Sequence, residues 1–200
     1  MENLQIGTFG WQYDSWRGGF YPDDLPEEWM LDYYSNAYRV VLVPQVNWLS
    51  WNDEQIEEVV DAVEGDFSFY FEVRDACDET KESQLTAIVE KLSSLSAGVV
   101  MFSEEQGTPL TCAGLPVTLV SKTQILPGWQ WVYGNQTCSG ALCGVVEGVS
   151  DDAKAQTELL QSYMKSLPET LQGGALLVKA ENVNMKQLFN LKTIGEFLGY

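Results

Sequence analysis

Segments with the pattern of β-strands alternate with helical segments along most of this 200-residue chain. The clearest strand is Phe67 to Val73, where phenylalanines at every second position share one face and polar side chains share the other. A helical segment follows at Glu79 to Leu95, with apolar residues three and four positions apart. This alternation is typical of an α/β protein with a parallel sheet.

The alternation predicts eight strands and five helices. The predicted strands are Leu4–Thr8, Arg39–Val43, Phe67–Val73, Gly98–Phe102, Pro116–Ser121, Trp129–Tyr133, Leu142–Glu147 and Ala175–Ala180. The predicted helices are Pro26–Asn36, Asn52–Gly65, Glu79–Leu95, Ser150–Met164 and Asn184–Leu198. We therefore expect a trimmed (β/α)8 TIM-like barrel with some helices missing in the middle of the chain, where connections are short. An open doubly wound sheet is the alternative that the same order permits.

A single domain over residues 1–200 is expected, because no linker, repeat or low-complexity stretch divides the chain. The 45% hydrophobic content supplies enough apolar surface for one core. If the barrel closes, the last predicted strand should pair with the first.

The charge balance excludes several functions. The chain has 11 Lys and Arg against 29 Asp and Glu, a formal net charge of −18. Such a surface repels phosphate backbones and anionic lipids, so we expect neither nucleic acid nor membrane as a partner. Because the chain has 0 His, it cannot contain zinc sites with His ligands or Ser–His and Cys–His catalytic pairs.

The compartment expected from the sequence is the cytoplasm. The first residues have neither a basic start nor an apolar signal-like region, and the apolar runs are too short to span a membrane. In that compartment the four cysteines, Cys77, Cys112, Cys138 and Cys143, are expected as reduced thiols that pack like small apolar side chains. The alternative is a redox or metal pair at Cys138 and Cys143.

An unusual motif follows the first predicted strand. Residues 6–22 read IGTFGWQYDSWRGGFYP. This segment resembles the opening motif of the YecE-like family, also called domain of unknown function 72. The matching positions are Gly10, Trp11, Tyr13, Trp16, Gly18, Phe20, Tyr21 and Pro22. The resemblance implies a TIM-barrel-like fold and supplies no reaction.

Weaker matches and departures accompany this motif. Glu72 and Arg74 resemble the Glu-x-Arg of the family at a strand end, and Asn182 is the surviving residue of a Phe-Asn-Asn motif. The segment Val41 to Gln45 lacks the acid that the family usually has after its second strand, and the family's histidines are absent. These losses favour a member that kept the fold without the chemistry.

Candidate site residues are expected at the carboxyl ends of the strands, where parallel barrels carry their sites. Glu72 alternates with phenylalanines, so its side chain should point into the barrel, near Arg74 or Lys179. There it is either a general acid/base or metal ligand, or a structural partner of one of these cations. Lys179 is a tentative second catalytic residue, as a Schiff-base nucleophile, and its alternative is an ion pair with a glutamate.

The remaining candidates concern ligand binding. Trp11, Tyr13 and Trp16 would form an aromatic wall for a sugar or planar ligand, or simply pack as core. Arg74 and Asn182 are further candidates for substrate binding. No cofactor is predicted, although Glu72, Glu147 and Glu181 are weak candidates for holding Mg²⁺ or Mn²⁺. The best functional hypothesis is a small-molecule-binding barrel with an acid/base or divalent-metal site, and the alternative is a non-catalytic binding or interaction module.

Overall fold

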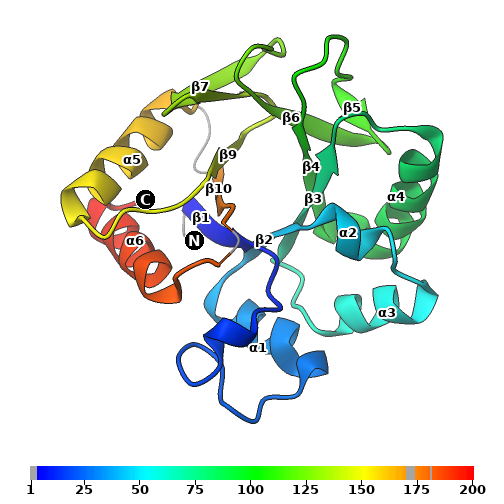
Figure 1. Ribbon diagram of the computed structural model, residues 1–200, viewed down its shortest axis with the longest axis horizontal. Coiled ribbons are helices and arrows are strands. Elements are labelled where there is room, and N and C mark those ends of the chain that lie inside the picture. The colour runs from blue at the N-terminus through cyan, green and yellow to red at the C-terminus, as the bar shows by residue number, and fades with distance from the viewer. Residues whose placement is uncertain (1–3, 170–173, 181) are drawn as a thin grey trace.

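The central feature of the protein is a curved sheet surrounded by helices, seen in a computed structural model that describes residues 4–169, 174–180 and 182–200 (Figure 1). The strands are β1 (Leu4–Phe9), β2 (Val40–Val43), β3 (Ser68–Arg74), β4 (Ser96–Phe102), β5 (Thr111–Cys112), β6 (Leu115–Ser121), β7 (Trp129–Tyr133), β8 (Gln136–Gly140), β9 (Cys143–Val146) and β10 (Gly174–Val178). The helices are α1 (Met30–Ala37), α2 (Gln45–Trp48), α3 (Asp53–Asp61), α4 (Glu79–Leu92), α5 (Ala153–Ser166) and α6 (Met185–Leu198).

The strand order is that of a barrel. Along the sheet it runs β7-β8-β6-β4-β3-β2-β1-β10-β9, with β5 paired beside β6. All neighbours from β6 to β9 along this path are parallel. Leu4 of β1 lies opposite Gly174 of β10, so the first and last strands are adjacent. This pairing confirms the prediction for a barrel and disfavours the open doubly wound alternative.

The barrel is nearly closed, with a seam between β8 and β9. In the described chain these two strands share no backbone ladder. Side chains bridge them instead: Gln136 Nε2 donates to the Val145 carbonyl at 2.9 Å, and the Val145 amide donates to Cys138 Sγ at 3.3 Å. The seam is therefore held by side chains from β8 that reach the backbone of β9.

Helices are missing from the middle of the chain, as predicted. Across residues 96–152, all of which the structure describes, no helix is present. In Figure 1 the edge between α4 and α5 is accordingly covered only by strands and loops. Outside this stretch, side chains cap the first turns of the helices. Asn52 caps α3 and forms a capping box with Gln55, and Asp78 caps α4.

A hairpin replaces one of the predicted barrel strands. The segment Trp129–Tyr133 was expected as a strand by itself, but it turns back through Gly134 and Asn135 and pairs with β8. Gly134 has a φ of +62°, which suits the first position of a two-residue hairpin turn. Three elements, β8, β5 and α2, were not predicted from the sequence. β8 consists mostly of polar residues without an apolar alternation, and β5 and α2 are too short to show any periodicity.

Most of the buried side chains on the sheet are apolar. Each residue of β2 is fully buried, as expected for a strand between the barrel interior and a layer of helices. Glu72, near the carboxyl end of β3, is the one charged side chain among the buried residues that the structure describes. This exception directs attention to the end of the barrel where β3 finishes.

Candidate functional site

Glu72 is fully buried and forms ion pairs with two cations. Its Oε1 atom lies 3.0 Å from Nε of Arg74 and 3.0 Å from Nζ of Lys179. The sequence-based prediction that Glu72 points inward toward Arg74 or Lys179 is confirmed, and both cations take part. Burying an unpaired carboxylate would be costly, so these contacts explain how β3 tolerates an acid at this position.

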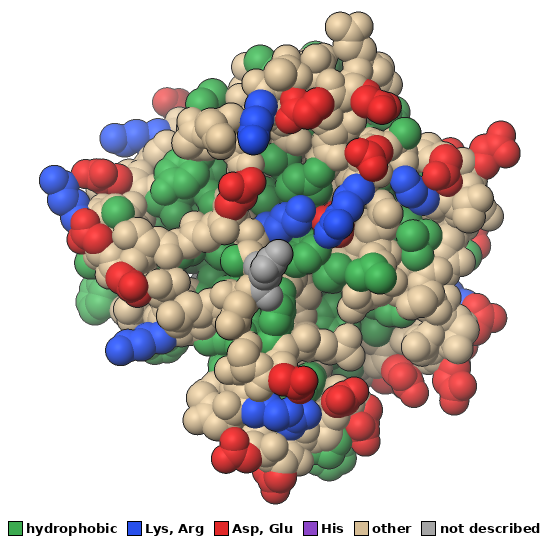
Figure 2. Space-filling view, viewed as in Figure 1, with side chains coloured by type: hydrophobic (Ala, Val, Ile, Leu, Met, Phe, Trp, Pro, Cys, Tyr) green, Lys and Arg blue, Asp and Glu red, His purple; other side chains and the backbone are tan. Residues whose placement is uncertain are grey.

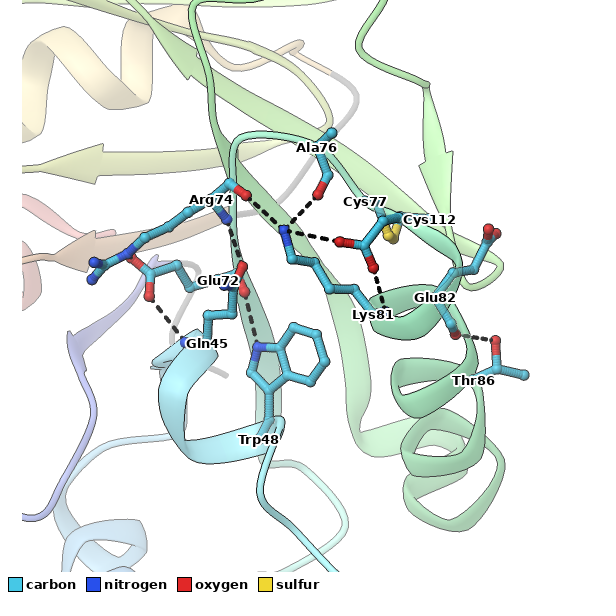
Figure 3. Close-up of a disulfide and its surroundings, with 11 residues drawn as sticks. Gln45, Trp48, Glu72, Arg74, Ala76, Cys77, Lys81, Glu82, Thr86 and Cys112 are labelled. Atoms are coloured by element: carbon cyan, nitrogen blue, oxygen red, sulfur yellow. Dashed lines mark hydrogen bonds and ion pairs between the residues drawn. A yellow bond between two sulfur atoms is a disulfide. The ribbon is translucent and has the colours of Figure 1, made fainter.

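Gln45 holds the other side of the Glu72 carboxylate. The Gln45 backbone amide donates to Glu72 Oε2 at 2.9 Å, and the Gln45 side-chain oxygen accepts from the Arg74 amide at 2.8 Å (Figure 3). Trp48 Nε1 donates to the Glu72 carbonyl at 2.8 Å. Helix α2, which starts directly after Pro44, brings both residues to the end of β3. Gln45, which lies where the family usually has an acid, therefore forms hydrogen bonds to the end of β3.

Lys179 follows β10 and lies between its carboxylate partner and two aromatic rings. Its Nζ atom is 3.7 Å from the centre of the Phe102 ring and 5.2 Å from that of Phe9. The backbone amide of Lys179 donates to the Val146 carbonyl of β9 at 2.8 Å. The Lys179 side chain is 24% exposed, so its charged end remains accessible from the barrel mouth.

A cavity of about 830 Å³ opens at this end of the barrel. Its lining residues are Phe9, Arg74, Asp75, Phe102, Glu147, Lys179 and Ala180. Figure 2 shows Lys and Arg side chains near the centre of this face, beside hydrophobic side chains and with acidic ones around them. The cavity is of the size that holds small ligands. Glu72 is not part of the lining, because its own cations lie over it.

The loop after β3 fixes one wall of the cavity. Asp75 has a φ of +63°, and its amide donates to the Phe102 carbonyl at 3.0 Å. Lys81 Nζ donates to the carbonyls of Arg74 and Ala76, at 3.1 and 2.7 Å (Figure 3). These bonds hold the backbone on both sides of Asp75, directly after Arg74 at the end of β3.

The predicted aromatic wall is mostly core. Trp11 and Trp16 are buried, and Trp16 Nε1 donates to the Val183 carbonyl at 2.8 Å. Tyr13 stacks on Trp16 with ring centres 4.5 Å apart, and its hydroxyl donates to the Phe9 carbonyl. Burial raises the pKa of Tyr13 to about 12. Tyr13 and Trp16 therefore pack the loop after β1 against the loop after β10, whereas Trp11 contacts Trp51, and none of the three lines the mouth cavity.

Asn182 lies in a different hollow from Lys179. Its Oδ1 atom accepts from the Ser15 hydroxyl at 2.7 Å. Together with Trp16 it lines a groove of about 860 Å³ between the loop after β1 and helix α6. The structure thus brings Glu72, Arg74, Lys179 and Glu147 together at the mouth, and places Asn182 and Trp16 elsewhere.

Sequence reasoning did not find Phe9 and Phe102 as cavity residues. Each of them ends or follows a strand, so the rule that sites lie at carboxyl ends of strands could have found them. The rule was applied to polar side chains, and the two phenylalanines were therefore overlooked.

Comparison with known proteins identifies the family. The model of a family described as "Protein of unknown function DUF72" matches residues 5–110, which is just over half of the chain. The chain belongs to the DUF72 family. No curated protein matches the sequence.

Two solved DUF72 structures share the fold. A DUF72 family protein of Thermotoga maritima aligns with a TM-score of 0.55 and 14% identity, covering 98% of this chain and 99% of that one. A DUF72 family protein of Enterococcus faecalis aligns with a TM-score of 0.57 and 11% identity, covering 96% and 95%. At such identities the likeness concerns the fold alone, and it agrees with a TIM-like barrel.

The weak metal candidates of this DUF72 chain form no ligand set in the part that the structure describes. Both oxygens of Glu72 already accept bonds from protein groups. Glu147 lines the cavity, whereas Glu72 does not. Glu181 lies outside the described residues. A role for Mg²⁺ or Mn²⁺ thus stays a prediction from sequence.

Two of the four cysteines correct the sequence-based expectation. Cys77 and Cys112 form a disulfide that links the loop after β3 to β5, so they are not reduced thiols (Figure 3). They are 35 positions apart, and only the path of the chain between β4 and β6 brings them together. Cys138 and Cys143 are free and buried, as expected. Burial raises the pKa of Cys138 to about 12, so it remains a thiol at neutral pH.

No described helix is long and apolar enough to cross a membrane.

Proposed function

We propose that the mouth cavity of this DUF72 protein binds a small organic anion through Lys179 and Arg74. The observation that carries the proposal is the convergence of both cations on one buried oxygen at the edge of a ligand-sized cavity. In a chain with a net charge of −18, two adjacent cations that both line one hollow stand out. Their position at the carboxyl end of a barrel sheet is where such folds bind ligands.

The separation of the two cations suits one anionic group. Because Nε of Arg74 and Nζ of Lys179 each lie 3.0 Å from the same oxygen, they are no more than about 6 Å apart, a distance that a single carboxylate or phosphate can bridge. The end of the Arg74 guanidinium points away from Glu72 (Figure 3), and this side chain is 57% exposed. Each cation thus has donors left for a ligand.

Glu72 has a positioning role in this proposal. A general acid or base must reach the reacting atoms, but the Glu72 carboxylate is fully buried and its cations separate it from the cavity. Lys179 is likewise a ligand-binding group here. Its Nζ atom contacts the Glu72 carboxylate and the face of the Phe102 ring, which are partners that suit a cation. These features support a binding site over an acid/base centre.

Calorimetric titration tests the proposal, with benzoate, propionate and inorganic phosphate as probes at low salt. We expect saturable binding, and we expect Lys179→Met to weaken it roughly 10- to 100-fold because a charge-assisted hydrogen bond is lost. Lys122→Met is the control, since Lys122 is an exposed lysine after β6 that does not line the cavity. The proposal fails if none of the probes binds the wild type, or if both variants bind as the wild type does.

The cytoplasmic location remains a prediction, and the Cys77–Cys112 disulfide counts against it. Disulfides are uncommon in the reducing cytoplasm. Alkylation of free thiols while cells are lysed in denaturant, followed by mass spectrometry, separates the two compartments. Labelling of Cys138 and Cys143 alone after denaturation places the protein in an oxidising compartment, whereas labelling of all four cysteines supports the cytoplasm.

A further inference from the structure

We infer that the mouth cavity selects monoanionic carboxylates with an apolar body over dianions, and that Asp75 and Glu147 enforce the selection. This inference rests on the proposed anion site and deepens it by naming the ligand class. Both acids line the same cavity as Arg74 and Lys179.

The positive charge available to a ligand is confined to the cation pair, because the two acids of the lining are negative. Arg74 and Lys179 carry two positive charges, of which the buried Glu72 carboxylate compensates one. One unit of positive charge is therefore left at the cation pair, whereas the five charged groups together, with Asp75 and Glu147 included, are net negative. A second negative charge on the ligand would face the two acids of the lining with no cation to offset it.

Each acid is a neighbour of one of the cations, in the chain or across two strands. Asp75 follows Arg74 in the chain, and the bond from its amide to the Phe102 carbonyl holds it at the cavity. Glu147 follows β9, whose Val146 accepts the bond from the Lys179 amide, so Glu147 emerges next to Lys179 on the neighbouring strand. The two acids thus line the cavity together with the cation pair, from the ends of two different strands. Like charges set against an unwanted ligand are a common way to obtain specificity.

The rest of the lining favours an apolar ligand body. The rings of Phe9 and Phe102 lie beside the Lys179 ammonium, and Ala180 completes the apolar part. A ligand whose carboxylate reaches the cations can place its hydrocarbon portion against these rings and remove apolar surface from water. An aromatic or branched aliphatic carboxylate fits this arrangement.

Benzoate and phenyl phosphate test the selection, because they share an aromatic body and differ in charge when titrated about two pH units above the second phosphate pKa. We expect the wild type to bind benzoate at least roughly tenfold more tightly, a difference of about 1.4 kcal/mol. The double variant Asp75→Asn/Glu147→Gln should lose this discrimination by gaining affinity for phenyl phosphate. Asparagine suits the positive φ of residue 75.

A matched control removes the same charge elsewhere. Glu27→Gln/Glu28→Gln neutralises two exposed acids ahead of α1, outside the cavity, and should leave the discrimination unchanged. Equal or tighter binding of phenyl phosphate by the wild type overturns the inference while the anion site stands. The inference also fails if the discrimination persists in the Asp75/Glu147 variant, or falls equally in the control. If neither benzoate nor phenyl phosphate binds the wild type, the proposed function itself is overturned.

Discussion

At the scale of single residues, a few carboxylates are held by dense sets of donors. Glu72 accepts from two cations and one amide, and Glu104 accepts from Ser121, Lys122 and Thr123. Replacing either residue removes an acceptor that several donors share, so it should cost more than replacing an acid without such bonds. Both residues lie at the carboxyl ends of strands, near the mouth of the barrel.

Replacing Glu72 with Gln should lower the free energy of unfolding by about 1–3 kcal/mol. The loss is smaller than for a fully buried pair because the Arg74 side chain is 57% exposed and water screens its charge. Urea denaturation measures this change, with the exposed Glu105→Gln as control.

The same Glu72→Gln variant tests the positioning role under native conditions. Lys179 loses its carboxylate partner, so acetic anhydride should label it faster, while the labelling rate of Lys122 stays the same. Mass spectrometry of the peptides measures both rates. Unchanged labelling of Lys179 would contradict the positioning role even if stability falls.

Glu104 should make stability depend on pH in the acidic range. Its hydrogen bonds lower its pKa from 4.5 to about 2, the Thr123 hydroxyl being the largest cause. Because the folded-state value is depressed, the contribution is fully present above the unfolded pKa and is lost as pH falls toward about 2. Glu104→Gln should therefore be less stable than wild type at neutral pH. The difference in free energy of unfolding between the two proteins should shrink as the pH falls from about 4.5 to about 2. Urea midpoints at several pH values measure it, and a gap independent of pH would refute the explanation.

At the scale of elements, the barrel depends on close approach of its strands. β1 lies between β10 and β2, and the backbone at Gly7 leaves no room for a side chain. A Cβ atom there would lie 2.1 Å from the Val40 carbonyl oxygen of β2. Since that contact involves backbone, only a shift of a whole strand could relieve it.

Gly7→Ala should destabilise the protein by more than about 3 kcal/mol, because overpacking against a backbone atom cannot be relaxed by a side-chain rotation. Gly148→Ala is the matched control, since no atom lies within 4 Å of the added Cβ, and it should change stability by less than about 1 kcal/mol. Thermal denaturation compares the two. A Gly7→Ala protein as stable as the control would contradict the packing of β1 on β2.

At the scale of the whole molecule, acidic charge dominates the surface. The formal net charge is −18, and the cation pair at the mouth is a local exception. Association with polyanions is opposed by this field, whereas a small ligand that enters the cavity meets the nearby cations first.

We predict no measurable binding of DNA or RNA at physiological salt. Affinity for nucleic acids comes largely from Lys and Arg that displace counterions, and this chain has 11 such residues against 29 acids. A titration of fluorescent duplex and single-stranded oligonucleotides measures the affinity. Micromolar binding with a steep salt dependence would overturn the prediction.

The sequence by itself determined what depends on neighbouring residues. Strand and helix periods are local, so most of the alternating elements and the missing helices were predicted correctly, whereas β5, β8 and α2 were not. The alternation in β3 sufficed to place Glu72 inside the barrel. The motif after the first strand sufficed for the family.

Only the tertiary structure decided which distant residues meet. Lys179 and Arg74 share one oxygen of Glu72 because barrel closure brings β10 and β3 to a common mouth, and sequence offered either cation as the partner. Trp16 became core and Phe102 became cavity wall through packing between loops far apart in the chain. The Cys77–Cys112 disulfide depends likewise on the path from β4 to β6. Such contacts have no local signal, since they form only when strand register and closure set the positions of whole elements.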